Sequence, residues 1–502
     1  MFGKSMRQFG LTAAFVVVPM SVLIPARAPV QAVGMFEGHG DVGKVVHAGS
    51  VIFDAAKQTY AMKASGHNMW STDDAFHFVW KKVSGDAAIS ADIAWDSSGG
   101  NAHKKAVLIM RQTLDADSAY VDVAAHGDGT FALQHREAKG AATHEVQGNA
   151  SRPSRLQLRK MGGYFHMSQA SSSKELQVAS GAVPVTLSDP YYIGIGLCSH
   201  DANVVEGATF SNVAISQTPS TSTEKPRLFS VLEMITISNT DRRTVKVFEG
   251  RAEAPNWAKD DTLIYNSGGR LYRIPIAGGE PVAIDTGFAN RNNNDHGISP
   301  DGTMLAISDQ SQEQRRSIIY TVPIGGGTPT RVTQAAPSYW HGWSPDGKLL
   351  AYVGERNANF DIYTIAVGGG PETRLTTADG LDDGPDYSPD GQYIYFNSVR
   401  SGTMQIWRMR PDGTGQEQIT SDDYNNWFPH PSPDGQRLVF LSYEKDVTGH
   451  PENKHVMLRV MTLADKRATI LTKLFGGQGT INVPSWSPDS RRVAFVSYLL
   501  LP

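Results

Sequence analysis

Imidazole and carboxylate side chains occupy matching positions in a repeated segment of the second half of the chain. His296 and His341 each stand three residues before the serine of a Ser-Pro-Asp-Gly turn, whereas Asp386 and His430 each stand two residues before such a serine. Together these groups suit a borderline divalent ion such as Mn, Fe, Ni or Zn. One hypothesis is therefore a metal site formed by the four residues. The alternatives are histidines that bond loop backbone and histidines that contact a ligand without a metal.

Two of these residues stand three positions before the turn serine and two stand two positions before it, and this difference limits how they could form one site. Side chains two and three residues before a turn point to opposite faces of a regular strand. The four groups therefore converge only if the strands that carry them begin irregularly.

Further polar and aromatic side chains surround these positions in each repeat. The aromatic ones could stack on sugar rings or pack between neighbouring repeats. Arg356 and Arg400 could clamp a carboxylate or phosphate by paired hydrogen bonds, or form ion pairs with Glu355 or a neighbouring aspartate. The candidate ligand-binding residues are Asn294, Asp295, Tyr339, Trp340, Arg356, Asp382, Asp383, Arg400, Asn426, Trp427 and Asn482.

Histidines elsewhere in the chain have less specific surroundings. His450 and His455 fall in an insertion that lengthens the last interval between turns, and we expect a solvated loop there. A cluster of histidine, aspartate and asparagine surrounds Trp70 at residues 67–77. This cluster is open to two interpretations, a carbohydrate site or half-buried strand and turn residues.

An internal repeat builds the elements that must position the candidate residues. The turn occurs at residues 299–302, 344–347, 388–391 and 432–435, with a variant at 487–490 and a degenerate first copy at 257–261. Each turn precedes an alternating strand, such as residues 304–308, and a second strand follows. Units of roughly 44 residues and four strands indicate the blades of a β-propeller. Six copies predict a six-bladed propeller over residues 227–502.

The ends of the repeat region are expected to close the ring. The last copy holds only its first two strands before residue 502, and residues 232–238 and 244–249 could supply the missing two. In a propeller the Ser-Pro-Asp-Gly turns share one face, and the residues before the first strands lie on the other face. We therefore expect the candidate residues to gather at one mouth of the central channel.

Residues 33–216 are also rich in β-strand patterns but do not repeat. Their short apolar or alternating runs, separated by turn residues, predict a β-sandwich of jelly-roll type. A polar linker at residues 217–226 divides the two regions. The whole chain is therefore expected to be all-β, with a sandwich domain before the propeller.

The first 32 residues have the pattern of a secretory signal peptide. Lys4 and Arg7 precede an apolar stretch, and Val30-Gln31-Ala32 offers a cleavage site. We expect a periplasmic or secreted protein with no membrane span after cleavage, and an uncleaved anchor is the alternative. A formal net charge of −4 argues against a nucleic acid partner. The single cysteine, Cys198, excludes an internal disulfide.

The runs Tyr-Trp-His-Gly-Trp-Ser-Pro-Asp-Gly at 339–347 and Pro-Ser-Trp-Ser-Pro-Asp-Ser at 484–490 resemble the TolB-type propeller repeat. The resemblance covers roughly residues 227–502 and implies the architecture while leaving the activity open. Related propellers include the periplasmic Tol translocation protein, the non-catalytic domain of prolyl oligopeptidases, and oligogalacturonate lyases, which hold a metal at the propeller mouth by blade histidines. The N-terminal region is similar to concanavalin-like sandwich domains, many of which bind carbohydrate.

Two functions of different classes remain open at this point. The first is an exported TolB-like protein that binds an oligosaccharide or a periplasmic protein at the channel mouth and needs no cofactor. The second is a metal-dependent lyase or hydrolase acting on acidic oligosaccharides. In that enzyme the metal and an arginine would neutralise a uronate, and a His or Tyr base would remove the adjacent proton.

Overall fold

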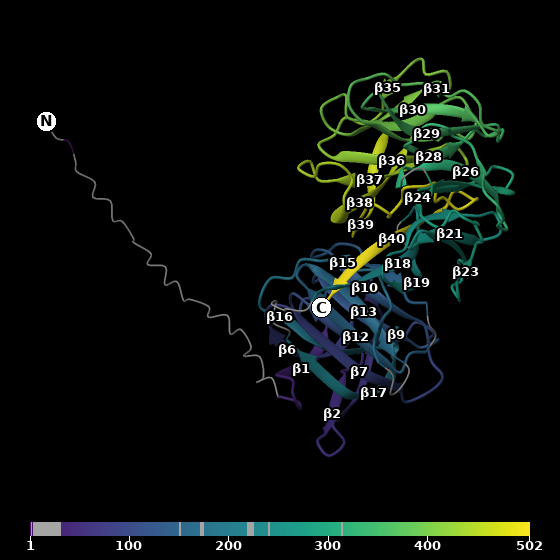
Figure 1. Cartoon of the computed structure of the whole chain (residues 1–502). Coiled ribbons are helices and arrows are strands. Elements are labelled where there is room, and N and C mark those ends of the chain that lie inside the picture. The colour runs from purple at the N-terminus through teal and green to yellow at the C-terminus, as the bar shows by residue number, and fades with distance from the viewer. Residues whose placement is uncertain are drawn as a thin grey trace.

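The computed structural model describes residues 1, 3, 32–149, 152–170, 175–217, 225–238, 241–312 and 315–502. The expected signal peptide and the expected linker fall outside these residues except at a few end positions. Strands form two lobes, and the propeller lobe runs from teal through green to yellow (Figure 1). The described residues contain no helix long and apolar enough to cross a membrane.

The propeller lobe contains five four-stranded antiparallel blades, whose strands follow chain order. The blades are β20 (Glu253–Trp257) to β23 (Val282–Ala283), β24 (Asn292–Ile298) to β27 (Thr330–Arg331), β28 (Ser338–Trp343) to β31 (Thr373–Arg374), β32 (Asp382–Tyr387) to β35 (Glu417–Gln418), and β36 (Asn425–Pro431) to β39 (Arg467–Gly477). The first strand of each blade contacts the first strand of the next, so the five lie around a common axis.

The repeated turn joins the first and second strands of a blade through its own side chains. Ser299 donates its hydroxyl to Asp301 at 2.6 Å, and the amide of Gly302 donates to the Ser299 carbonyl at 2.8 Å. Gly302 has φ of 80°, a conformation that glycine adopts without strain. In the variant last turn Ser490 occupies this position with φ of 59°. The turn chemistry read from the sequence therefore sets where a blade passes from its first strand to its second.

The prediction of six blades is wrong, although the expected pairing between the ends of the repeat region is confirmed. β40 (Arg492–Leu501) pairs with β18 (Arg227–Thr236), which pairs with β19 (Arg242–Glu249). These strands do not form a separate four-stranded blade, because β19 pairs in parallel with β11 (His144–Gln147) of the N-terminal lobe. The inner strand of this copy is reduced to a single bridge between Trp486 and Val493.

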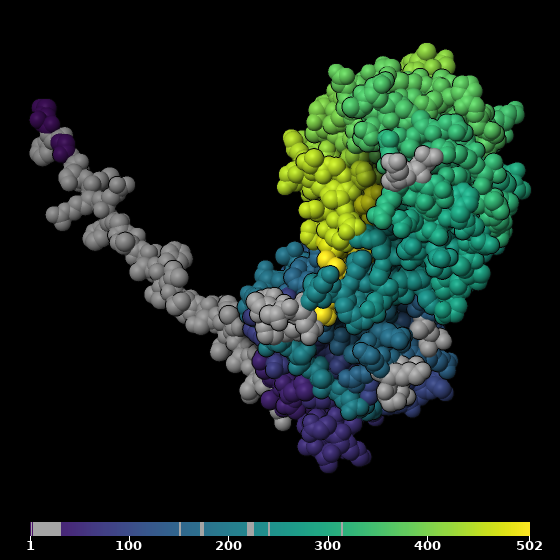
Figure 2. Space-filling view, viewed as in Figure 1, coloured from purple at the N-terminus to yellow at the C-terminus, as the bar shows by residue number. Residues whose placement is uncertain are grey.

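The three strands are therefore one edge of a ten-stranded sheet that joins the lobes. Its other strands are β1 (Gly38–Val42), β6 (Phe76–Val83), β16 (Tyr191–Cys198), β8 (Lys105–Arg111), β9 (Tyr120–His126), β10 (Phe131–Arg136) and β11. β40 contacts both β20 and β39, so it lies between the first and last blades. In the space-filling view the end of the chain, in yellow, lies at the junction of the lobes (Figure 2).

A second, eight-stranded sheet completes the N-terminal lobe. Its strands are β14 (Gln177–Val178), β13 (Tyr164–Ala170), β12 (Arg155–Met161), β7 (Ala87–Trp95), β17 (Asp201–Ser216), β3 (Thr59–Gly66) and β2 (Ser50–Asp54), with β15 (Val183–Pro184) paired to β13. The jelly-roll prediction is wrong, because β8 to β11 form a meander of sequential neighbours and their sheet continues into the propeller lobe. A jelly roll would instead require two Greek keys.

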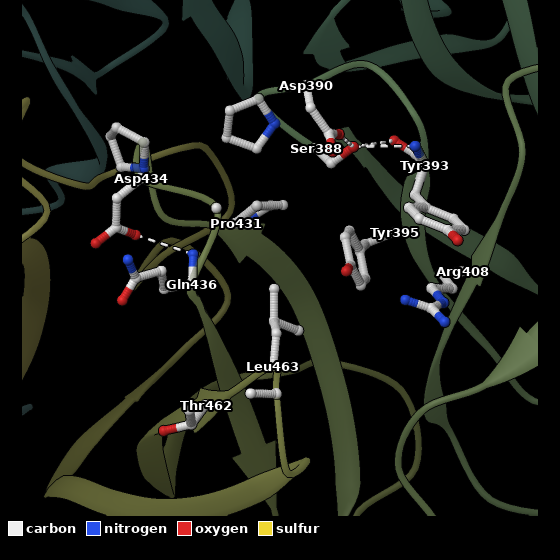
Figure 3. A pocket seen from close by; sticks show the side chains of 14 residues that line it. Ser388, Asp390, Tyr393, Tyr395, Arg408, Pro431, Asp434, Gln436, Thr462 and Leu463 are labelled. Atoms are coloured by element: carbon white, nitrogen blue, oxygen red, sulfur yellow. Dashed lines mark hydrogen bonds between the residues drawn. The ribbon is translucent and has the colours of Figure 1, made fainter.

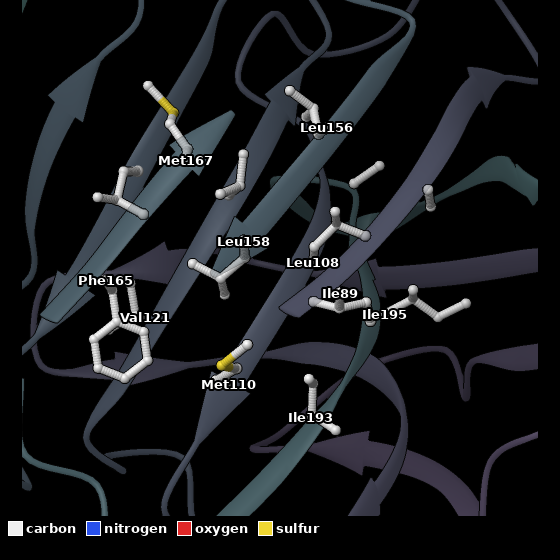
Figure 4. Close-up of a cluster of buried hydrophobic side chains, with 14 of the residues drawn as sticks. Ile89, Leu108, Met110, Val121, Leu156, Leu158, Phe165, Met167, Ile193 and Ile195 are labelled. Atoms are coloured by element: carbon white, nitrogen blue, oxygen red, sulfur yellow. The ribbon is translucent and has the colours of Figure 1, made fainter. Parts of the chain in front are cut away.

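Apolar side chains of the two sheets share the core of this lobe (Figure 4). Leu108 and Met110 on β8 are fully buried, and so are Leu156 and Leu158 on β12. Because successive side chains of a strand alternate, the neighbouring residues of β8 point to the opposite face of the ten-stranded sheet. That face holds buried polar side chains, among them Lys105 and Arg111.

Candidate functional site

A cavity of about 320 Å³ lies where the inner strands of four blades begin. Each of these strands is interrupted by a bulge close to its start, between Asn292 and His296 in β24 and at equivalent places in β28, β32 and β36. The irregular starts that convergence requires are therefore present. The cavity is lined by Asn293, Asp295, Tyr339, His341, Val353, Phe360, Leu381, Asp383, Phe428, His450, Gln478 and Asn482.

The four proposed metal ligands are only partly brought together. His341 lines the cavity, whereas His296 is buried with its Nε2 3.4 Å from the carbonyl oxygen of Ile264. His430 lies between Asp386, at 3.1 Å, and a backbone carbonyl. Among the described residues no group of three or more His, Cys, Asp or Glu side chains could hold a metal ion. The histidines thus bond backbone or a single carboxylate.

Two carboxyl groups in the cavity have opposite electrostatic environments. Burial is the main reason that the pKa of Asp295 rises to about 6, with His341 opposing the rise and Asp383 adding to it. Burial would also raise the pKa of Asp383, but a hydrogen bond and the charge of His341, with the charge of His450, hold it below its ordinary value. At neutral pH the cavity therefore contains a firmly ionised Asp383.

His341 is charged more readily than an ordinary histidine. Burial alone would lower the pKa of its imidazole, but Asp295 and Asp383 raise it above the usual value. His450 lies on the other side of Asp383, with its Nε2 3.8 Å from the carboxylate. The cavity therefore combines acidic groups with two imidazoles, and the carboxyl groups favour the charged form of His341.

The two tryptophans proposed as sugar platforms are core residues. Trp340 and Trp427 are each only 1% exposed. Trp340 packs against Gly297 of the neighbouring blade, and the ring of Trp427 lies 4.5 Å from that of His450. The third aromatic candidate, Tyr339, is half-buried and does line the cavity. Packing between blades therefore explains both indoles.

The two arginines proposed as anion clamps are engaged in ion pairs on the blades. Arg356 pairs with Glu372 at 2.8 Å, and Arg400 pairs with Asp382 at 2.6 Å. Arg356 also donates to the backbone carbonyl of Glu355 rather than to its carboxylate. Of the two roles considered for these arginines, clamping an anionic ligand or forming an ion pair within the protein, the structure shows the ion pair.

The three asparagines among the candidates have structural partners. Asn294 accepts a hydrogen bond from Gln478, and Asn482 donates to Gln478 while lining the cavity. Asn426 is fully buried and donates to Asp422 at 2.9 Å. Asn482 is thus the member of this group that is placed to meet a ligand.

Sequence reasoning misplaced two histidines of the insertion. The expected solvated loop is wrong for His450, whose half-buried ring lines the cavity and lies 5.3 Å from that of Phe428. His455 lies on β38 (Glu452–Thr462), stacked on Tyr164 of the N-terminal lobe at a ring separation of 5.0 Å. The signal that could have found His450 is the extra length of the insertion on the face where the inner strands begin.

A larger cavity of about 570 Å³ lies among the Ser-Pro-Asp-Gly turns, at the opposite end of the inner strands (Figure 3). Its acidic side chains are committed to the turns, since Asp390 accepts from Ser388 at 2.6 Å and Asp434 from Ser432 at 2.5 Å. These carboxylates hold the backbone of the turns, so this cavity is the weaker candidate for a functional site.

The sequence and the geometry agree with known proteins. A family model described as the TolB beta propeller domain matches residues 334–498. An uncharacterized protein of Agrobacterium fabrum strain C58 is 51% identical over 271 residues, which are 54% of this chain and 92% of that protein. A solved structure of a TolB candidate from Agrobacterium tumefaciens is 50% identical, covers 55% of this chain and 99% of that chain, and has a TM-score of 0.53.

A crystal structure of TolB from Acinetobacter baumannii is 15% identical, covers 64% of this chain and 79% of that chain, and has a TM-score of 0.41. The blades and the matching relatives define a class, that of the all-β propeller proteins. Within that class, the chain belongs to the TolB-like β-propeller family.

Proposed function

We propose that the protein is an exported binding protein whose propeller cavity holds a basic segment of a protein partner. The observation that carries this proposal is the pair of buried carboxyl groups, Asp295 and Asp383, inside a cavity whose other walls are largely apolar. Lysine and arginine have the matching chemistry, an apolar stem with a cationic end. Phe360 and Phe428 would contact the stem while the carboxylates bind the cation.

The cavity suits a cation better than an acidic sugar. None of the twelve described side chains that line it is a lysine or arginine, so a uronate would meet two carboxyl groups without a fixed positive charge. The arginines proposed for that role are paired with Glu372 and Asp382. A metal-dependent lyase has no metal site among the described residues, so we favour binding over catalysis.

A peptide array tests the proposal directly. The probes are acetylated peptides that carry Lys, Arg, Gln or Glu at one central position between aromatic neighbours. We expect the Lys and Arg peptides to bind the wild-type protein, and both Asp383→Asn and Asp295→Asn to weaken this binding at least tenfold. The matched control is Asp423→Asn, since this propeller aspartate is exposed and pairs only with surface Lys445.

Two results would count against a basic ligand. One is equal binding of the Gln and Lys peptides, and the other is basic-peptide binding that survives both cavity substitutions. Elemental analysis of the purified protein addresses the lyase separately, since that enzyme requires a near-stoichiometric transition metal.

Export is the second part of the proposal. Its support is the basic and apolar pattern of the first residues, with a cleavage site at Val30-Gln31-Ala32. N-terminal sequencing of the protein recovered from the periplasm should find a chain that begins near residue 33. A cytoplasmic protein that retains its first residues would contradict export without affecting the cavity.

A further inference from the structure

A further cavity, of about 380 Å³, lies on the N-terminal lobe. It is formed on the face of β8, β9 and β10 that points away from the shared apolar core, beside the short strand β4 (Met69–Trp70). Its lining includes Asn68, Trp70, Lys105, His126, Gln134 and Glu145. Asn68 and Trp70 belong to the histidine and aspartate cluster singled out in the sequence, but the other four come from strands that the sequence did not connect with it.

The remaining members of that sequence cluster have structural partners. Asp74, on β5 (Asp73–Asp74), is fully buried and pairs with Arg136 at 2.8 Å and with Arg111 at 3.4 Å. His77 bonds Asp41 of the neighbouring strand at 2.7 Å. The cluster is therefore mostly structural, and only its end next to β4 faces the cavity.

His126 brings a bare hydrogen-bond acceptor to the cavity. Thr130 donates its hydroxyl hydrogen to Asp128, so its oxygen is free to accept a hydrogen bond from Nδ1 of His126 at 3.3 Å. Burial lowers the pKa of His126 to about 3, so the ring is neutral and its Nε2 carries a lone pair. That Nε2 is buried without a partner in the described structure.

Gln134 supplies a second bare acceptor. Its amide nitrogen donates to Glu145 at 3.2 Å, whereas its Oε1 is buried without a partner in the described structure. The side chain is only 1% exposed. An acceptor left in this state is costly, so a bound donor would recover a substantial penalty.

The strand register sets the distance between these two acceptors. His126 and Gln134 lie on the same face of β9 and β10, separated along the strands by four residues, or about 13 Å. Ala124 and Ala132 are paired between them on that face, where both are buried and Ala124 belongs to an apolar cluster with Met69. The two acceptors are therefore separated by about the length of one or two sugar rings.

The other groups of the lining define the ligand further. Asn68 accepts at its Oδ1 from Lys105, at 3.1 Å, and from the backbone, which leaves its amide hydrogens as donors. Trp70 is half-buried and offers an apolar ring surface. The carboxylate oxygens of Glu145 already accept from Gln134 and Gln147. Among the described residues that line the cavity, the buried side-chain atoms without a partner belong to His126, Gln134 and His200, and none of them is a carboxylate oxygen. Imidazole and amide acceptors match hydroxyl donors better than an ammonium ion.

We propose that this cavity binds a neutral sugar, whose hydroxyl groups donate to His126 and Gln134 and whose ring lies against Trp70. A hydroxyl both donates and accepts, so one sugar can satisfy the two bare acceptors and the amide of Asn68 together. The site is separate from the propeller cavity and does not depend on what binds there.

The probes are a glycan array of neutral monosaccharides and disaccharides, with uronic acids and amino sugars on the same array, followed by calorimetry of the hits. We expect at least one neutral sugar to bind with Kd at or below about 1 mM. Gln134→Met removes the acceptor at similar volume, and Trp70→Ala removes the ring surface. Each should weaken binding at least tenfold in a protein that still unfolds cooperatively on heating, which shows that the variant is folded.

Two controls keep the result specific. Gln157→Met makes the same chemical change at a half-buried position of β12, outside this cavity, and Asp383→Asn alters only the propeller cavity. Both should leave sugar binding unchanged. The proposal is overturned if no neutral sugar binds, if only charged sugars bind, or if binding survives both Gln134→Met and Trp70→Ala. Loss of sugar binding in Asp383→Asn would also overturn it, by placing the sugar in the propeller.

Discussion

The imidazole of His341 and the carboxylate of Asp383 belong to neighbouring inner strands, and Nε2 lies 3.1 Å from Oδ1. Both groups are almost completely buried, so each controls the charge of the other. Asp383 contributes to the raised pKa of His341, and His341 contributes to the lowered pKa of Asp383. This pair is the electrostatic centre of the propeller cavity, and the first prediction follows from it.

Asp383→Asn should lower the pKa of His341, because the neutral amide no longer stabilises the imidazolium while burial still disfavours it. NMR titration of the histidine ring resonances measures this change. Asp423→Asn, on the exposed surface, should leave the titration of His341 unchanged. An unchanged His341 midpoint in Asp383→Asn would show that the two groups are not coupled in solution.

Binding of a basic peptide should strengthen roughly tenfold between pH 5 and pH 7.5. Over this range Asp295, with its pKa near 6, gains a negative charge. Glu253, which interacts with Asp295 and whose pKa burial raises to about 7, does the same. A rising pH can only remove positive charge from His341, whose pKa the two carboxyl groups raise, whereas Asp383, whose pKa is held below its ordinary value, stays ionised. All these changes favour a cation.

The control for this pH dependence is Asp295→Asn, in which the increase in affinity should be smaller because one titrating carboxyl group is gone. Fluorescence anisotropy with a labelled Lys peptide gives the affinity at each pH. A pH profile that is identical in wild type and Asp295→Asn would remove Asp295 from the binding site.

Gly297→Ala should destabilise the propeller by about 1–3 kcal/mol through overpacking. A Cβ at Gly297 would overlap the ring of Trp340, which is held in the core between blades. Gly325→Ala is the matched control, because a Cβ there meets nothing within 4 Å and its φ is not positive. Urea denaturation compares the free energies of unfolding, and equal values for the two variants would contradict the packing of Trp340 described here.

Glu233→Gln should destabilise the protein by about 3–5 kcal/mol, because it leaves the buried guanidinium of Arg242 without its ionic partner. Glu233 on β18 pairs with Arg242 on β19 at 2.7 Å and accepts from Ser497 on β40 at 2.6 Å. Glu249→Gln breaks the exposed pair with Arg227 in the same sheet and should change stability little. Thermal unfolding of both variants decides whether the three-strand junction depends on this carboxylate.

The repeat made the blades predictable, since its turn residues act locally. The strand expected at residues 304–308 corresponds to β25 (Met304–Asp309). The number of blades was not predictable from the turns, because it depends on the parallel pairing of β19 with β11. β11 lies more than 90 residues before β19 in the chain, so no local pattern links the two strands. Counting turn motifs therefore overestimated the closed units by one.

The candidate site was predicted in part for the same reason. Position in the repeat placed Asp295, His341 and Asp383 at the starts of inner strands, where they do meet. Repeat position did not separate these cavity residues from the core residue Trp340. An alternating pattern shows which side chains share a face of a strand, but it does not show which face meets a neighbouring blade. The slot that buries Trp340 is made by Gly297, 43 positions earlier in the chain.

The pairing of β18 with β40 affects how the chain can fold during synthesis. Glu233 and Ser497, which bond each other across that pairing, are 264 residues apart. At roughly 5–20 residues per second a ribosome needs tens of seconds to supply the partner strand. Meanwhile β18 has an open edge of the kind that recruits strands from other molecules. A premature stop codon between the end of β18 and Arg492 should therefore yield aggregating fragments and no shortened working protein.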